Sequence, residues 1–223
     1  MKHTRLDASA PIEQVNFALA AAVLGELRRK GVSGRSGAAV GAALLDSDTR
    51  FAARLPGRME RVDVEVGSKR LPVVMDGAHV PFNIGAVLRD LALAPDLSGP
   101  CVAIVALAAD KDAQGFVAEL AGRASAVVFT DLPGSSRGRS PVELRALAES
   151  LGLVSEVEPE PKRALKRGLE LAREANAWLL VTGSLYLVGA LRPAIGEAAA
   201  LPSGTGAAPP FGHAPVRGPG GSG

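Results

Sequence analysis

The sequence has 223 residues, 47% of them apolar, and a formal net charge of +2 from 25 basic and 23 acidic side chains. This length allows one substantial domain with an appendage, and the apolar content excludes disorder throughout the chain. The balanced charge argues against nucleic acid as a partner, because phosphate binding needs a concentrated basic surface.

The chain shows no signal for a membrane or an oxidising compartment. No apolar run approaches the ~20 residues that span a bilayer, and no secretory signal core precedes Asp7. The single cysteine, Cys101, excludes an intramolecular disulfide and is expected to be a small buried hydrophobic residue. We therefore expect a cytoplasmic protein without membrane partners.

The first segment, residues 1–54, is rich in alanine and predicts helices. Val15, Leu19, Val23 and Leu27 recur at helical spacing, and Gly31 follows as a stop signal. A second helix is predicted over residues 36–45. Two short helices make a poor independent domain, so we expect them to pack on another surface.

The central segment, residues 55–200, opens with a predicted hairpin. Residues 62–66 alternate strictly between apolar and polar, which is typical of a half-exposed strand. A turn at residues 67–70 follows, and residues 71–75 then read as a buried strand. The first strand is therefore expected to be antiparallel to the second.

The rest of this segment alternates apolar strand patterns with helical patterns, which predicts right-handed crossovers. We expect an α/β, Rossmann-like, doubly wound and mostly parallel sheet of about six strands, preceded by the short helical segment. Such sheets bind ligands beyond the carboxyl ends of their strands. The further predicted strands are 102–107, 126–130, 154–157 and 178–182, and the predicted helices are 82–93, 114–124, 141–151, 163–174 and one beginning near Ser184.

The last segment, residues 201–223, is dominated by glycine, proline, alanine and serine. Because this composition buries too little apolar surface to offset its ordering entropy, we predict a disordered tail. The expected organisation is therefore a helical remnant (1–54), an α/β domain (55–200) and a tail (201–223).

Polar residues follow the first predicted buried strand. Asp76 can accept hydrogen bonds from two hydroxyls, as from a ribose, or can cap the turn that follows. Gly77 permits a tight turn or a close backbone approach, and His79 is either a phosphate contact or a hydrogen-bonded turn residue. Pro81 suits the first position of the next helix.

Two later strands end in similar polar groups. Lys111, between Asp110 and Asp112, can hold a substrate carboxylate as a point charge, although an aspartate there can equally cap a helix. Ser184, after a glycine, can donate to a ligand or cap the last helix.

Two further candidates precede the sheet. Arg58 can pair bidentately with phosphate oxygens, or it can be a surface arginine paired with Glu60. Asn16 interrupts the apolar pattern of the first helix, and its amide suits an adenine edge or an ordinary polar helix face.

Several catalytic motifs do not occur in the sequence. It has no Gly-x-x-x-x-Gly-Lys-Ser/Thr phosphate loop, no Gly-x-Gly-x-x-Gly dinucleotide fingerprint and no Gly-x-Ser-x-Gly elbow. Three histidines and one cysteine provide no zinc constellation.

The order of the polar segments resembles the carboxy-terminal domain of folylpolyglutamate synthase/dihydrofolate synthase, a branch of the Mur ligase family. The resemblance covers about residues 11–192, and its two longest motifs surround Asp76 and Ser184. It rests on Gln14-x-Asn16, Pro56-Gly57-Arg58-Met59-Glu60, Asp76-Gly77-Ala78-His79-x-Pro81, Ala109-Asp110-Lys111-Asp112 and Thr182-Gly183-Ser184-Leu185-Tyr186-Leu187-Val188-Gly189.

The resemblance implies an ATP-dependent ligase that adds L-glutamate to dihydropteroate or to a folate through an acyl phosphate. It places Arg58 at the ATP phosphates, Asp76 at the ribose, His79 beside the nucleotide and Asn16 near adenine. Arg58 and His79 are the expected catalytic residues. Val80 stands where the family usually has asparagine.

The same resemblance places Lys111 and Ser184 near the incoming glutamate. It assigns the ATP phosphates and the Mg²⁺ ligands largely to an amino-terminal phosphate-loop domain that this sequence lacks, so a partner chain bearing that loop is expected. Two alternatives stay open: a stand-alone or degenerate adenine-nucleotide-binding module, and a Mur ligase acting on cell-wall precursors. The Gly183-Ser184-Leu185-Tyr186 motif argues against the cell-wall alternative.

Overall fold

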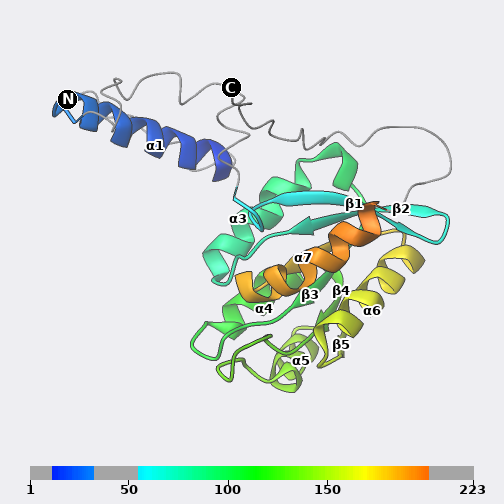
Figure 1. Cartoon of the computed structure of the whole chain (residues 1–223). Helices are drawn as coiled ribbons and strands as arrows, with labels where there is room; N and C mark the ends of the chain where they lie inside the picture. Colours follow the sequence, from blue (N-terminus) through cyan, green and yellow to red (C-terminus); the bar gives the residue numbers. More distant parts are fainter. Residues whose placement is uncertain (1–11, 33–54, 201–223) are drawn as a thin grey trace, which may run out of the picture.

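The computed structural model describes residues 12–32 and 55–200. The helix predicted at residues 36–45 and the tail predicted at 201–223 lie outside these ranges. The prediction of an α/β fold is confirmed: a central six-stranded sheet is covered by helices on both faces (Figure 1).

The strands follow the order β1-β2-β6-β3-β4-β5 across the sheet. β2, β6, β3, β4 and β5 are parallel, and β1 alone is antiparallel to its neighbour, as predicted. The strands are β1 (Glu60–Val66), β2 (Lys69–Met75), β3 (Cys101–Val105), β4 (Ala124–Phe129), β5 (Ser155–Val157) and β6 (Trp178–Thr182).

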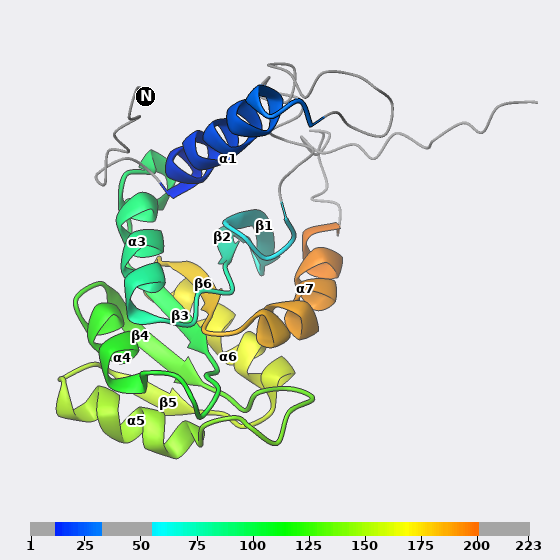
Figure 2. The same ribbon diagram turned by 90° about the vertical axis from the view of Figure 1, so that its left-hand side faces the viewer.

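Helices of two groups bury the two faces of the sheet (Figure 2). On one face, Ile84, Phe116 and Leu144 pack against the sheet from α3 (Pro81–Ala92), α4 (Ala113–Ala121) and α5 (Pro141–Ser150). On the other face, Leu165 and Leu187 pack from α6 (Pro161–Glu174) and α7 (Leu185–Ala200). The unalternated apolar strands β3 and β6 are fully buried because both of their faces are covered.

The hairpin between β1 and β2 turns over two residues, Gly67 and Ser68. Gly67 has a φ of 66°, which glycine adopts without steric cost, and Val66 pairs directly with Lys69. The strand therefore resumes two residues earlier than predicted.

Other predicted boundaries shift by one to three residues, and two of them have a clear cause. The helix predicted to end at Ala124 ends at Ala121, because the chain turns at Gly122 and Ala124 already opens β4. The strand predicted over residues 102–107 leaves the ladder after Val105, although Ala106 and Leu107 stay buried.

α1 (Ile12–Arg29) lies beside α3, outside the two layers of helices (Figure 2). Leu19 and Val23 are about half exposed on this helix, at 54% and 51%. A short 3₁₀ helix, η2 (Pro95–Leu97), connects α3 to β3. Within residues 12–32 and 55–200, no helix combines the length and the apolar character needed to cross a bilayer.

Candidate functional site

The polar segments singled out in the sequence meet at the carboxyl edge of the parallel strands. Four loops gather there: residues 55–59 before β1, the β2–α3 loop, the β6–α7 turn and the β3–α4 loop. Backbone hydrogen bonds join neighbouring loops, since the Gly77 amide donates to the Gly57 carbonyl and the Gly183 amide donates to the Ala78 carbonyl. These bonds connect the first three loops along the edge where a doubly wound sheet is expected to bind ligands.

Asp76 joins the first two loops. Its Oδ2 accepts from the Met59 amide at 2.9 Å and its Oδ1 accepts from the Ala78 amide at 2.8 Å. The side chain is only 4% exposed. Of the two predicted roles, the structure shows Asp76 as a turn cap; each carboxylate oxygen keeps a second lone pair that a ligand hydroxyl can use.

The pKa of Asp76 is raised above its ordinary value because burial disfavours the charged carboxylate. The hydrogen bonds from Met59 and Ala78 and the charges of Arg58 and His79 oppose this shift. Arg58 and His79 therefore lie close enough to Asp76 to favour its charged form.

Arg58 is held at the edge by a tight turn. Gly57 and Met59 both have positive φ, at 71° and 49°, and the Gly57 amide donates to Oε2 of Glu60 at 2.8 Å. The alternative that Arg58 pairs with Glu60 is wrong, because Glu60 pairs with Arg192 at 2.9 Å. The exposed Arg58 guanidinium has no hydrogen-bond or ion-pair partner in the part of the chain described.

Gly77 allows the close approach predicted for it. A Cβ at this position would overlap the side chain of Leu185 at the start of α7. A larger residue would therefore push the β2–α3 loop away from the β6–α7 turn.

His79 lies half-buried ahead of α3. Its Nδ1 donates to the Gly77 carbonyl at 3.0 Å, because a carbonyl can only accept, and Nε2 is left for another partner. α3 begins at Pro81, as predicted, and Val80 provides no side-chain cap for it. An asparagine at position 80 could accept from a first-turn amide, so valine leaves this helix start open to an anion.

Ser184 caps α7. Its Oγ accepts from the Tyr186 amide at 3.0 Å, and the side chain is 8% exposed. The preceding Gly183 has a φ of 92°, and a Cβ there would lie 2.5 Å from the Ala106 carbonyl oxygen. This contact sets the β6–α7 turn directly against the end of β3.

The charged residues of the β3–α4 loop make different contacts. Asp112 caps α4, with Oδ1 accepting from the Gly115 amide at 2.9 Å. Lys111 Nζ donates to Asp110 Oδ2 at 2.9 Å, in an ion pair whose aspartate side chain is 71% exposed. Lys111 is therefore ion-paired and partly buried at the edge, and the capping role predicted as an alternative belongs to Asp112.

The sequence-based prediction missed Arg137 and Arg139, which follow β4. The Arg137 carbonyl accepts from the Ala109 amide, and the Arg139 amide donates to the Leu107 carbonyl, each at 2.8 Å. The available signal was an Arg-Gly-Arg triplet just beyond the carboxyl end of a predicted strand.

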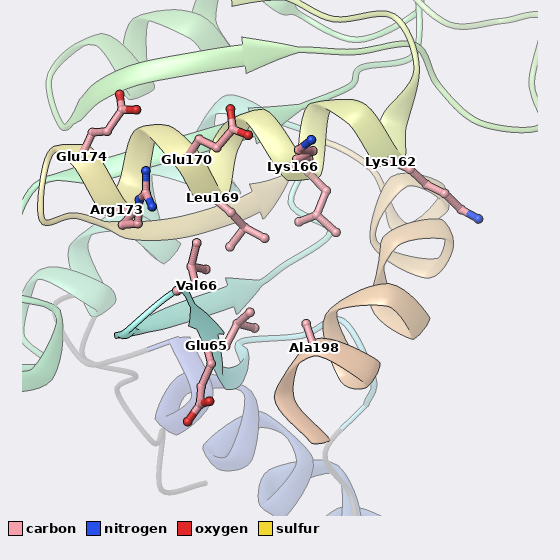
Figure 3. A pocket seen from close by; sticks show the side chains of 12 residues that line it. Glu65, Val66, Lys162, Lys166, Leu169, Glu170, Arg173, Glu174 and Ala198 are labelled. Carbon is pink, nitrogen blue, oxygen red and sulfur yellow. The ribbon is translucent and has the colours of Figure 1, made fainter. Parts of the chain in front are cut away.

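Asn16 is exposed on α1, the helix that lies outside the two layers covering the sheet. A groove of about 510 Å³ lies elsewhere, between the β1–β2 hairpin and helices α6 and α7 (Figure 3). Val66, Leu169 and Ala198 line it together with charged residues of α6, and it contains none of the predicted site residues. In residues 12–32 and 55–200, no group of three or more His, Cys, Asp or Glu side chains could hold a metal ion.

Three solved structures share this fold. Folylpolyglutamate synthase from Mycobacterium tuberculosis complexed with ADP is 27% identical, with a TM-score of 0.57, and the match covers 71% of this chain and 38% of that one. Folylpolyglutamate synthase from Thermotoga maritima is 23% identical, with a TM-score of 0.53 and coverages of 68% and 34%. E. coli FolC in complex with DHPP and ADP is 23% identical, with a TM-score of 0.50 and coverages of 74% and 40%.

These matches span well under half of the solved chains, and the two at 23% identity show the fold alone. No curated protein matches the sequence. A family model described as "Mur ligase, glutamate ligase domain" matches residues 57–185, which is more than half of the chain and includes Arg58, Asp76, His79, Lys111 and Ser184. The chain therefore belongs to the Mur ligase family and contains its glutamate ligase domain.

Proposed function

We propose that this chain is the carboxy-terminal, glutamate-ligating part of an ATP-dependent folate ligase that adds L-glutamate to dihydropteroate or a folate. The observation that supports this most directly is the Asp76 network. It brings Arg58, His79 and the uncapped start of α3 to one edge of the sheet, beside the loop that holds Lys111. The M. tuberculosis structure, a folylpolyglutamate synthase with ADP, supports the same assignment.

The described residues fit an anionic nucleotide. An exposed guanidinium without a partner and a helix start without a side-chain cap both favour phosphate oxygens. In the proposed site, Arg58 binds the phosphates, Asp76 accepts from the ribose hydroxyls and His79 uses Nε2 beside the nucleotide. Asn16 is proposed to contact adenine from α1, whereas the other proposed nucleotide contacts come from the loops at the edge of the sheet.

ATP would supply the phosphoryl group that activates the substrate carboxylate as an acyl phosphate. The chain's own residues would stabilise transferring charge, through Arg58, and would hold the incoming glutamate, through Lys111 and Ser184. The described residues do not fit a resident Mg²⁺, since they provide no ligand cluster, and we propose that a phosphate-loop partner holds it.

Titration of the full chain with a non-hydrolysable ATP analogue tests the nucleotide site. Arg58→Ala should weaken binding about tenfold, because it removes one charge-assisted contact to phosphate. Its free energy of unfolding should change by less than about 0.5 kcal/mol, since Arg58 is exposed. Arg61→Ala is the matched control, because Arg61 is an exposed arginine of β1 that pairs with Asp96 of η2.

Equal affinity of the Arg58→Ala and Arg61→Ala variants would refute the phosphate role of Arg58. If the unaltered chain does not bind the analogue at all, the result would favour the degenerate-module alternative. Turnover of ATP with dihydropteroate and glutamate by this chain alone would contradict the need for a phosphate-loop partner.

A further inference from the structure

Residues 137–139 form a strap across the β3–α4 loop, next to Lys111. Ala108 and Gly138 make an isolated antiparallel bridge, and the backbone hydrogen bonds of Ala109 and Leu107 to the strap lie on either side of it. The strap and the loop thus form a short two-stranded ladder beyond the ends of β3 and β4.

Arg139 anchors this ladder. Its Nη2 donates to the Ala109 carbonyl at 2.7 Å, and its Nη1 lies 3.4 Å from Oε2 of Glu143. Its Nε is buried without a partner in the described part of the chain. The charge of Arg139 is therefore committed to holding the loop and is not free for a ligand.

Arg137 differs from Arg139. Its side chain is exposed, and its guanidinium has no hydrogen-bond or ion-pair partner within the described ranges. It lies close enough to influence Asp110, whose pKa is lowered chiefly by the hydrogen bond from Lys111 and to a lesser extent by the charges of Lys111 and Arg137. Asp110 is thus ion-paired with Lys111 and lies within the electrostatic reach of Arg137, which is not bonded to it.

We propose that Lys111 and Arg137 together bind a carboxylate of the incoming amino acid, and that Asp110 occupies the place of this carboxylate until the substrate displaces it. The inference rests on the proposed function, and it adds Arg137 as a binding residue and Asp110 as an internal competitor. A guanidinium next to an ammonium suits a carboxylate, because the guanidinium can pair with both oxygens. The Asp110 side chain is 71% exposed, so water can take over its interactions and displacing it from Lys111 costs little.

The proposal predicts opposite effects for two substitutions in the full chain, measured by titration with L-glutamate and amide chemical shifts. Arg137→Ala should weaken L-glutamate binding about tenfold, because one charge-assisted contact is lost. Asp110→Asn should strengthen it by about threefold or more, because the internal competitor loses its charge. Arg145→Ala is the matched control, since it removes an arginine that pairs with Glu149 on the surface of α5.

Arg137→Lys separates charge from folding, because it keeps a cation and should bind more tightly than Arg137→Ala. The inference is overturned if Arg137→Ala binds L-glutamate as the unaltered chain does, if Asp110→Asn fails to bind more tightly, or if the unaltered chain shows no glutamate-dependent shift near Lys111. The ATP-analogue titration, repeated with Arg137→Ala, is expected to match that of the unaltered chain. Intact nucleotide binding with failed glutamate effects would overturn this inference and leave the proposed nucleotide site standing.

Discussion

Asp76 is the residue on which the geometry of the candidate site depends most. Its carboxylate accepts amides from Met59, 17 residues earlier in the chain, and from Ala78 on its own loop. Its raised pKa makes the stability of the fold dependent on pH.

Asp76→Asn should lower the free energy of unfolding by about 1–3 kcal/mol, because the new amide group leaves one backbone donor without an acceptor. The loss relative to the unaltered chain should grow as the pH falls. The folded chain holds the Asp76 proton more tightly than the unfolded chain, and this tighter binding adds to the free energy of unfolding. The added stability is fully present below the ordinary carboxyl pKa of 3.8 and is lost as the pH rises through the raised pKa of the folded state. Chemical denaturation across this pH range measures it.

Asp63→Asn is the control for this prediction. Asp63 is exposed on β1 and pairs with Arg70, so the change should alter stability by less than about 0.5 kcal/mol. A stability difference between the unaltered chain and Asp76→Asn that stays constant with pH would contradict the assignment.

The sequence allowed us to predict which residues lie at the carboxyl edge of the sheet. It did not allow us to predict the contacts that each of these residues makes. Asp76, Lys111 and Ser184 stand at strand ends, and strand ends can be recognised from local apolar patterns. The amide of Met59 and the Glu60–Arg192 pair could not be predicted, because they join positions that are distant in the chain. Long-range partners are set by tertiary packing, which periodicity does not encode.

At the scale of elements, the β6–α7 turn connects the two ends of the site. It donates to Ala78 from the Gly183 amide on one side and abuts the Ala106 carbonyl on the other. Its position therefore determines the spacing between the proposed nucleotide side and the proposed glutamate side.

Gly183→Ala should destabilise the fold by about 2–4 kcal/mol, because a Cβ meets the Ala106 carbonyl oxygen at 2.5 Å and the φ of 92° is strained for alanine. Gly189→Ala, one turn into α7, is the matched control. A Cβ there meets nothing within 4 Å, so helix propensity should make it stabilising by about 0.5–1 kcal/mol. Equal effects of the two substitutions in thermal or denaturant unfolding would contradict the close approach.

Helices and strands were predicted well where glycine and proline mark their ends. Pro81 opens α3 and Pro141 opens α5, in agreement with the sequence pattern. The pattern failed at Gly122, where the helix ends early and only Gly122 and Arg123 separate it from the next strand. Apolar residues on both sides of that turn suit either element, so periodicity could not separate them.

At the scale of the whole molecule, the sheet places β6 between β2 and β3, so the last strand of the chain lies at its centre. The alternation of strands and helices predicted a parallel sheet but not this order, because right-handed crossovers permit several orders. The order sets Ser184, after β6, between Asp76 after β2 and Lys111 after β3, and so brings these three residues of the proposed site to one edge. The Arg137–Ala109 contact likewise depends on β4 lying next to β3.

Cys101 reports on the integrity of this sheet. It lies on β3, between β6 and β4, and its side chain is 3% exposed. Burial raises the pKa of its thiol, so the reactive thiolate is scarce in the folded chain. Exposing this thiol requires separating central strands, which is expected to coincide with global unfolding.

We expect the alkylation rate of Cys101 to equal the rate in the denatured chain multiplied by the equilibrium constant of unfolding. The rate should therefore rise with denaturant concentration as global unfolding does. A nucleotide that binds the folded chain should slow it further, in proportion to ligand occupancy, because binding lowers the open population. A Cys101→Ala, Ser98→Cys chain is the control, since Ser98 is exposed and should react at the rate of a free peptide thiol. Labelling of Cys101 that is insensitive to denaturant would show local opening of β3. It would also contradict a single cooperative sheet that holds the two sides of the proposed site together.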